Sequence, residues 1–447
     1  MTDDLSRSGD PQSTLKDALS TLARRTKLPV ISWLMHSALT RPGLISLAAG
    51  FTDNPALPVE ISRRLLNEIL SSPKTGQPAL QYGITAGETN LRKLTAEHLR
   101  KLDLASVAAP RAGGRRIPAA VHSPDRLIIT GGSQQLLYMT LEALCDEGDI
   151  VLVEDPTYFV FLSILQSRGI GARGVKLERD GISPEHFEEV LRRLKKSGEL
   201  RRVKAIYLVT YFQNPTGATT SFRRKWGILA RLREAERAAG HPIYLIEDSA
   251  YRELRFSGGD TPSALMVPGA AGRVIHTGTF SKPFATGARV GYGILPEPVY
   301  TAVLRIKGNH DFGTANLLQQ LLARALETGL YRRHVAKIER RYREKAQAMK
   351  QAMAEHFPSS VEIWEPGGGL YFWARLPEAI STGIGSRVFQ SALKKGVLYV
   401  PGGICYAEDP SRRQPDHEMR ISYGNASEDD IRRGIRRLGA VLRRVCG

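Results

Sequence analysis

The chain has 447 residues, of which 42% are hydrophobic and 24% are charged. This length and composition predict roughly two to three domain-sized units with a large core, and they exclude a disordered, collagen-like or fibrous protein. The formal net charge is +18, but the basic residues are spread along the chain. That distribution favours a generally arginine-rich composition over a dedicated nucleic-acid-binding surface.

Cysteine usage and the N-terminal residues indicate the cellular setting. The three cysteines, Cys145, Cys405 and Cys446, are too few and too far apart for a disulfide framework or a paired metal motif. We therefore expect reduced thiols, no metal site and a cytoplasmic location. No apolar run approaches the ~18 residues of a spanning helix, and the polar N-terminus has no signal-peptide core, so we expect no membrane partner.

Residues 1–30 are polar and predict an N-terminal arm, and an amphipathic helix is expected over Glu60–Leu70. From about residue 80 to residue 300, short apolar runs alternate with helical patterns. The runs predict strands over Arg126–Thr130, Ile150–Glu154, Ala205–Thr210, Ile243–Glu247 and Val274–Thr277. The patterns predict helices over Gln134–Cys145, Phe159–Gln166, Pro184–Lys196 and Ser221–Ala239. Apolar strands separated by helices predict an α/β fold with a mostly parallel sheet covered on both faces.

The remaining segments are an insertion and a second group of elements. Ala105–His122 is rich in Pro, Gly and Arg, which predicts a surface insertion. Arg324–Phe357 predicts one long charged helix, and Leu370–Ala374 a strand. Near the C-terminus, Ser427 stands before three acidic residues, a pattern that predicts the N-cap of an amphipathic closing helix.

Polar clusters follow the carboxyl ends of several predicted strands, which is where ligands bind in open α/β sheets. Ser133 and Gln134 follow the first strand and open a helix. Asn214 follows the third, and Asp248 ends the fourth. Lys282 lies just beyond the fifth, in Thr-Phe-Ser-Lys. Each motif alone is weak; their shared position predicts a single ligand site.

The ordered motifs GGSQQ, DPTYF, QNPTG, EDSAY, TFSK and MRISYG resemble those of fold type I pyridoxal-phosphate enzymes, the aspartate-aminotransferase superfamily. The resemblance is to the 2-aminoadipate, kynurenine and aromatic aminotransferase branch, and it covers nearly everything from about Ile31. It implies a large domain over 76–330 with a mostly parallel seven-stranded sheet between helices, and a smaller α+β domain over 331–447. It also implies that the segment 31–75 packs with the small domain and the active site.

The resemblance implies roles for the residues that face the pyridoxal-phosphate ring. Lys282 would form an imine with the cofactor and then move the substrate α-proton. Asp248 would keep the pyridine nitrogen protonated. Tyr251 and Asn214 would hydrogen-bond the 3′-oxygen, and Tyr158 would stack on the ring. Read from the residues alone, Asp248 could equally be a helix N-cap, Asn214 a turn residue, and Tyr158 an ordinary core aromatic.

A phosphate site is implied by five residues. Ser133 and Gln134 begin a helix, where unpaired N–H groups favour an anion. Thr279 and Ser281 would add hydroxyls, and Arg289 a planar charged fork.

Further residues are implied for the partner subunit and the substrate. Tyr82, in LQYGITAG, would reach the phosphate of the neighbouring subunit in a homodimer with shared active sites. Arg420 would bind the substrate α-carboxylate, and Gly50 and Asn214 would lie beside the substrate. Departures from the family pattern at Tyr211, Thr52, Tyr371 and Cys405 leave the preferred amino acid open.

The resemblance therefore implies an aminotransferase that passes an amino group from an L-amino acid to a 2-oxo acid by a ping-pong cycle. A β-lyase, a decarboxylase or an oxidase on the same scaffold stays open, because the cofactor motifs do not decide which bond breaks. A DNA-binding regulator with an aminotransferase-like domain is disfavoured, because the residues before Ile31 hold no helix-turn-helix module.

Overall fold

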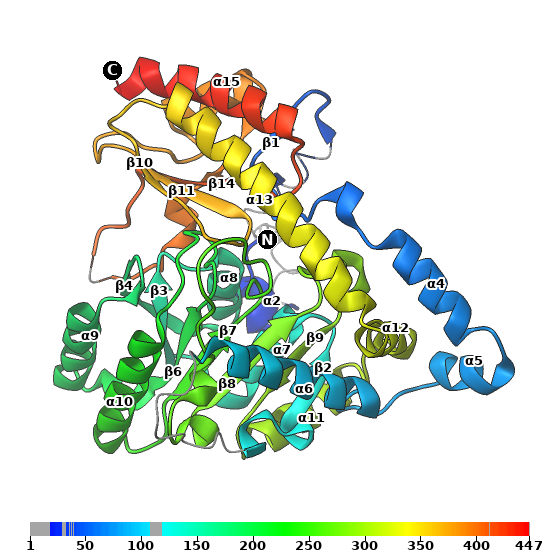
Figure 1. The fold of residues 1–447 in the computed structure, drawn as a ribbon. Coiled ribbons are helices and arrows are strands. Elements are labelled where there is room, and N and C mark those ends of the chain that lie inside the picture. Colours follow the sequence, from blue (N-terminus) through cyan, green and yellow to red (C-terminus); the bar gives the residue numbers. More distant parts are fainter. Residues whose placement is uncertain are drawn as a thin grey trace, which may run out of the picture.

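The computed structural model describes residues 18–28, 33–34, 36, 38, 40–107, 119–410 and 412–446. Figure 1 shows two layered parts: a large one built on a central sheet with helices on both sides, and a smaller one in which α13 and α15 cover a second sheet. Most of the predicted N-terminal arm lies outside the described residues. Its described part contains α2 (Thr21–Arg25).

The central sheet has eight strands. Their order is β2 (Leu127–Thr130), β9 (Gly291–Ile294), β8 (Val274–Thr279), β7 (Tyr244–Asp248), β6 (Val203–Val209), β3 (Ile150–Asp155), β4 (Gly171–Glu178) and β5 (Gly181–Ile182). β9 is antiparallel to β2 and β8, and β5 is antiparallel to β4. The other neighbouring pairs are parallel, which confirms the predicted α/β fold. The resemblance implied seven strands, and the structure has eight because the two-residue strand β5 pairs with β4 at the edge of the sheet.

Helices cover both faces of this sheet, because alternate side chains of each strand point to opposite sides. Val151 and Val153 pack into one apolar layer, and Ile150 and Leu152 into the other. The first layer contains α7 (Ser133–Leu144), α8 (Phe159–Arg168) and α11 (Val299–His310). The second contains α4 (Val59–Ile69), α5 (Pro73–Leu80), α6 (Thr89–Ser106), α9 (Pro184–Lys196), α10 (Phe222–Ala239) and α12 (Asn316–Glu327).

The smaller part is built on a four-stranded antiparallel sheet, the C-terminal sheet. Its order is β10 (Glu362–Trp364), β11 (Tyr371–Arg375), β14 (Glu418–Ser422) and β13 (Val400–Pro401), and it packs with α13 (Leu330–His356), α14 (Arg387–Lys394) and α15 (Glu428–Cys446). β1 (Ile45–Ser46) pairs with β12 (Val397–Leu398). An N-terminal segment is thereby joined to this C-terminal part.

Three sequence predictions can be compared directly with the structure. The single helix expected over Arg324–Phe357 is wrong: α12 ends at Glu327 and α13 starts at Leu330, because Gly329 adopts φ 68° between them. The cap at Ser427 is confirmed, since its hydroxyl accepts a hydrogen bond from the Asp430 N–H at 3.1 Å. Of the expected insertion Ala105–His122, residues 105–106 end α6, 119–122 form a 3₁₀ helix, and 108–118 lie outside the described residues.

The described residues also bear on the membrane and metal expectations. Among them, no helix combines the length and apolar character needed to cross a membrane. Within the same residues, no group of three His, Cys, Asp or Glu side chains is arranged to hold a metal ion.

Candidate active site

A cavity of about 110 Å³ lies at the carboxyl ends of β6, β7 and β8. Its lining comprises Ser133, Gln134, Tyr158, Val209, Asn214, Asp248, Ala250, Tyr251, Thr279, Ser281, Lys282, Thr286 and Arg289. Every residue predicted to bind the cofactor, except Tyr82, is in this set. The parallel strands explain the convergence, since their carboxyl ends share one edge of the sheet.

One end of the cavity is a corner formed by Arg289 and the start of α7. Gly132 adopts φ 90° just before Ser133, and an added Cβ there would lie 2.7 Å from Nη2 of Arg289. Arg289 Nη1 donates to the Ser281 hydroxyl at 3.4 Å, and Nη2 to the Gly131 carbonyl at 3.5 Å. Both bonds are long, so the guanidinium keeps most of its capacity for a bound anion beside the helix N-terminus.

The turn between β8 and Lys282 is held by its own hydroxyl groups. Thr279 Oγ1 donates to the Val290 carbonyl at 3.2 Å and accepts a hydrogen bond from the Ser281 N–H at 3.0 Å. This turn directs Lys282 into the cavity, where Nζ donates to the Gly50 carbonyl at 3.0 Å. Burial lowers the pKa of Lys282 below its ordinary value. The environment therefore favours the neutral, nucleophilic amine.

Asp248 is the last residue of β7 and is buried at the base of the cavity. Its Oδ2 accepts a hydrogen bond from the Tyr207 hydroxyl at 2.9 Å, and its Oδ1 one from the Ala250 N–H at 3.0 Å. Burial raises the pKa of Asp248, and these two hydrogen bonds oppose that rise by stabilising the carboxylate. The sequence reasoning did not identify Tyr207, whose ring stacks on Phe161 with centroids 3.7 Å apart.

Arg420 enters from the C-terminal sheet, on β14, and is 1% exposed. Nη1 donates to Asn214 Oδ1 at 2.7 Å and Nη2 to the Ala48 carbonyl at 2.6 Å, while Nε has no hydrogen-bond partner among the described residues. The guanidinium lies over the Tyr371 ring, 4.3 Å from its centroid. The structure thus brings the predicted substrate residue Arg420 against the predicted cofactor residue Asn214.

Two tyrosines and a glycine close the space between Arg420 and Lys282. The hydroxyl groups of Tyr251 and Tyr371 lie 3.2 Å apart. An added Cβ on Gly50 would lie 2.6 Å from the Tyr371 hydroxyl, so only glycine fits this approach. The predicted substrate residue Gly50 therefore lies beside both the amine and the tyrosine pair.

Within one chain, Tyr82 does not line this cavity. It is 83% exposed, and its ring makes an edge contact with Phe312, with centroids 5.6 Å apart.

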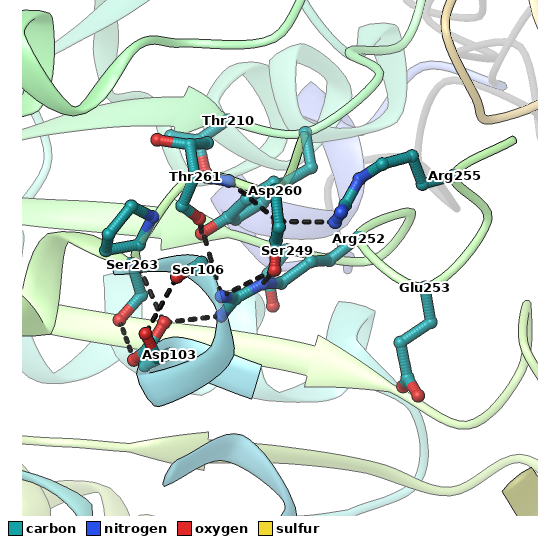
Figure 2. Close-up of polar contacts among 12 residues, drawn as sticks. Asp103, Ser106, Thr210, Ser249, Arg252, Glu253, Arg255, Asp260, Thr261 and Ser263 are labelled. Carbon is teal, nitrogen blue, oxygen red and sulfur yellow. Dashed lines mark hydrogen bonds and ion pairs between the residues drawn. The ribbon is translucent and has the colours of Figure 1, made fainter. Parts of the chain in front are cut away.

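A buried charge network supports the loop that follows β7 (Figure 2). Arg252, next to Tyr251, pairs with Asp103 at 2.7 Å and with Asp260 at 3.0 Å. Burial alone would raise the pKa of Asp103, but hydrogen bonds from His122 and Ser263 and the charge of Arg252 hold it well below its ordinary value. The network fixes the segment that carries Tyr251. The members of this network lie far apart in the sequence, so no local pattern predicted it.

Comparison with known proteins identifies the family. The family described as aminotransferase class I and II matches residues 43–438. The chain belongs to this family. Aromatic-amino-acid aminotransferase 1 of Thermococcus litoralis is 34% identical over 90% of this chain and 88% of its own length. The findings favour transamination over the other pyridoxal-phosphate reactions and over a DNA-binding regulator.

Two solved structures are similar to this aminotransferase over nearly its whole length. Kynurenine aminotransferase of Pyrococcus horikoshii, solved with PMP, is 30% identical, with a TM-score of 0.85 over 98% of this chain and 100% of that one. Alpha-aminoadipate aminotransferase of Thermus thermophilus, in complex with N-(5′-phosphopyridoxyl)-L-leucine, is 30% identical, with a TM-score of 0.80 over 96% and 98%. Pyridoxal phosphate is the cofactor of this aminotransferase.

The side chains around the cavity fit that cofactor. Arg289 and the start of α7 provide cationic and N–H donors for a phosphate, and Asp248 is a buried carboxylate suited to a protonated pyridine nitrogen. Lys282 offers a buried amine, and burial lowers its pKa. These three kinds of group match the three polar functions of pyridoxal phosphate.

Proposed function

We propose that the 110 Å³ cavity is the active site in which this aminotransferase moves an amino group from an L-amino acid to a 2-oxo acid. The observation that carries the proposal is the convergence of Lys282, Asp248 and Arg289 on one cavity, with Arg420 reaching its edge through Asn214. Bound pyridoxal phosphate supplies an electron-accepting ring that stabilises negative charge at the substrate Cα.

In this proposal Lys282 carries the proton. A neutral Nζ takes the α-proton from the substrate Cα and then donates it to another atom of the bound reactants. One general base therefore serves each half of the cycle. Burial lowers the pKa of Lys282, which places the free amine at a lower pH than for an exposed lysine. The Gly50 carbonyl, 3.0 Å from Nζ, holds the amine in place before substrate arrives.

Arg420 orients the substrate by binding its α-carboxylate. Its two terminal nitrogens now donate to Asn214 and to the Ala48 carbonyl. A carboxylate can accept two parallel hydrogen bonds from a guanidinium, and that geometry fixes the direction of the Cα–H bond. The Tyr371 ring below the guanidinium limits its movement.

A half-reaction assay tests the proposal. The purified enzyme is mixed with single amino acids and no 2-oxo acid, using L-tyrosine, L-kynurenine and L-2-aminoadipate, which follow the names of the similar proteins. The proposal predicts loss of the visible absorbance of the bound cofactor with formation of pyridoxamine phosphate. A 2-oxo acid should restore the absorbance. Lys282→Ala should show neither change; a Lys282→Ala variant that converts amino acid at the wild-type rate contradicts the proposed role.

The proposal also includes a cytoplasmic homodimer in which Tyr82 serves the phosphate of the partner subunit. Its support is the exposure of Tyr82 and of Phe312 beside it, 83% and 57%, which leaves an aromatic pair facing outward. In a two-fold dimer each subunit offers the same patch to its partner.

Mixing two inactive variants tests this sharing. Lys282→Ala is combined with a Tyr82 variant severe enough to be inactive. A heterodimer then contains one site with both defects and one with neither, so up to about half of the site activity per heterodimer should return. Verified subunit exchange without recovery of activity would show that Tyr82 does not serve the partner.

A further inference from the structure

Residues 48–53, here called the strap, cross the active site between Arg420 and Lys282. The strap begins next to the C-terminal sheet, where the Leu47 N–H donates to Leu398 and the Leu47 carbonyl accepts from Ser422, at 2.8 and 2.7 Å. Along the strap, the Ala48 carbonyl accepts from Arg420 and the Gly50 carbonyl from Lys282. Two backbone carbonyls of one segment therefore accept hydrogen bonds from the two basic side chains of the proposed chemistry.

The other end of the strap is anchored by Asp53, which is 2% exposed. Its Oδ1 accepts a hydrogen bond from Lys345 Nζ at 2.7 Å, and its Oδ2 pairs with Nε of Arg341. The Asp53 N–H donates to the Tyr342 hydroxyl at 3.1 Å. All three partners lie on α13, so one residue fixes the strap to that helix.

The anchor leaves the strap little freedom. Lys345, 1% exposed, also donates to the Gly424 carbonyl at 2.8 Å, which ties the anchor to the turn after β14. A buried ammonium that loses its carboxylate partner is costly, because nothing else compensates its charge. The strap is also tightly packed, as the Gly50 approach to Tyr371 shows. Asp53 itself is absent from the cavity lining.

We propose that Asp53 is a positioning residue for the transamination reaction. By fixing the strap, it sets the Ala48 and Gly50 carbonyls so that Arg420 and Lys282 are presented to the amino-acid substrate. The inference rests on the proposed roles of Arg420 and Lys282, and it adds a residue that touches neither substrate nor cofactor. A purely structural anchor would instead stabilise the fold without affecting the substrate.

Asp53→Asn tests the inference, because asparagine keeps the shape and the backbone N–H but removes the charge. The measurements are KM and kcat for the amino acid that reacts best in the half-reaction, the Kd for pyridoxal phosphate, and amide hydrogen exchange over 47–54 in the holoenzyme. We expect KM to rise about tenfold, the equivalent of about 1.4 kcal/mol, with a smaller change in kcat. Exchange over 47–54 should accelerate, and the cofactor Kd should stay within twofold.

Glu236→Gln is the matched control. Glu236, on α10, accepts hydrogen bonds from Arg273 at 2.6 and 3.2 Å and from the Ile243 N–H at 3.1 Å, at the opposite edge of the sheet from the cavity. This control removes a paired carboxylate of comparable geometry, so it should lower the melting temperature without changing KM or exchange over 47–54.

The inference is overturned if Asp53→Asn lowers the melting temperature as Glu236→Gln does while KM or exchange over 47–54 stays at the wild-type value. If Asp53→Asn does not fold, Arg341→Gln takes its place with the same readouts, because the Arg341 side chain is 39% exposed and its loss is tolerated more easily. Failure of the proposed function gives a different result, namely a Lys282→Ala enzyme that still converts the amino acid.

Discussion

Removing the hydroxyl of Tyr207 tests how its hydrogen bond to Asp248 affects cofactor binding. This hydroxyl donates to Asp248 Oδ2 at 2.9 Å inside the central sheet, where Tyr207 is fully buried. Tyr207→Phe removes only this hydroxyl and keeps the ring that stacks on Phe161. The variant therefore deletes one hydrogen bond to the carboxylate and little else.

The expected size of the effect follows from the charge on the acceptor. A hydrogen bond to a charged group contributes about 1.5–3 kcal/mol. Because the bond stabilises the ionised form of Asp248, its loss should raise the pKa of that carboxyl by about one to two units. Pairing with a protonated pyridine nitrogen needs the ionised form. The Kd for pyridoxal phosphate should therefore rise most at the low end of the pH range, by up to about 10- to 100-fold where the carboxyl of the empty site is protonated, and least at high pH.

The assay is a titration of the apo-enzyme with pyridoxal phosphate between pH 6 and 9, followed by absorbance. Tyr399→Phe is the control, because the Tyr399 hydroxyl is equally buried and donates to the Thr382 carbonyl at 2.8 Å in the C-terminal part. It should reduce stability and leave the Kd unchanged. A Tyr207→Phe enzyme with a wild-type Kd at every pH would refute the reasoning.

Two further outcomes are expected. Arg289→Ala should weaken pyridoxal phosphate binding by about 2–5 kcal/mol with little change in amino-acid preference; an unchanged Kd would mean that the phosphate lies elsewhere. Burial raises the pKa of Glu154 to about 8 from 4.5, against hydrogen bonds from Val209 and Gln213. The folded enzyme therefore keeps a proton that the unfolded chain releases, and stability should fall by about 2 kcal/mol from pH 6 to pH 8. Denaturant unfolding of Glu154→Gln should lack this fall.

The sequence was sufficient to predict those parts of the fold that depend on local patterns of apolar residues. The observed ends of β3, β6 and β7 lie within two residues of the predicted ends. Strands buried on both faces are continuously apolar, so an apolar run marks their length. The convergence of Asp248 and Lys282 on one cavity could be predicted for the same reason, because each lies at or just beyond the end of such a run. The family motifs then supplied the identity of the ligand.

Other features depend on contacts that no local pattern encodes. β9 is rich in glycine and has no strand-like pattern, yet it fits between β2 and β8 because Gly291 and Gly293 allow close packing against α7. Tyr207 looked like one more apolar residue of its strand, although a tyrosine inside a buried run needs a partner for its hydroxyl. That need is the signal that could have identified it. Asp53 could not be found this way, because Lys345 lies 292 positions away.

The break at Gly329 makes α13 a separate helix that contacts both α12 and α15. Figure 1 shows this helix running from beside α12 to beneath α15, so it crosses from one part of the enzyme to the other. At 1.5 Å per residue, Lys345 lies about 24 Å along the helix from Gly329. A rotation of about 5° with Gly329 as the pivot would shift Lys345 by about 2 Å, and Asp53 and the strap would travel with it. A shift of that size would break the 3.0 Å bond between Gly50 and Lys282, so the position of α13 is coupled through Asp53 and the strap to the hydrogen bond of this lysine.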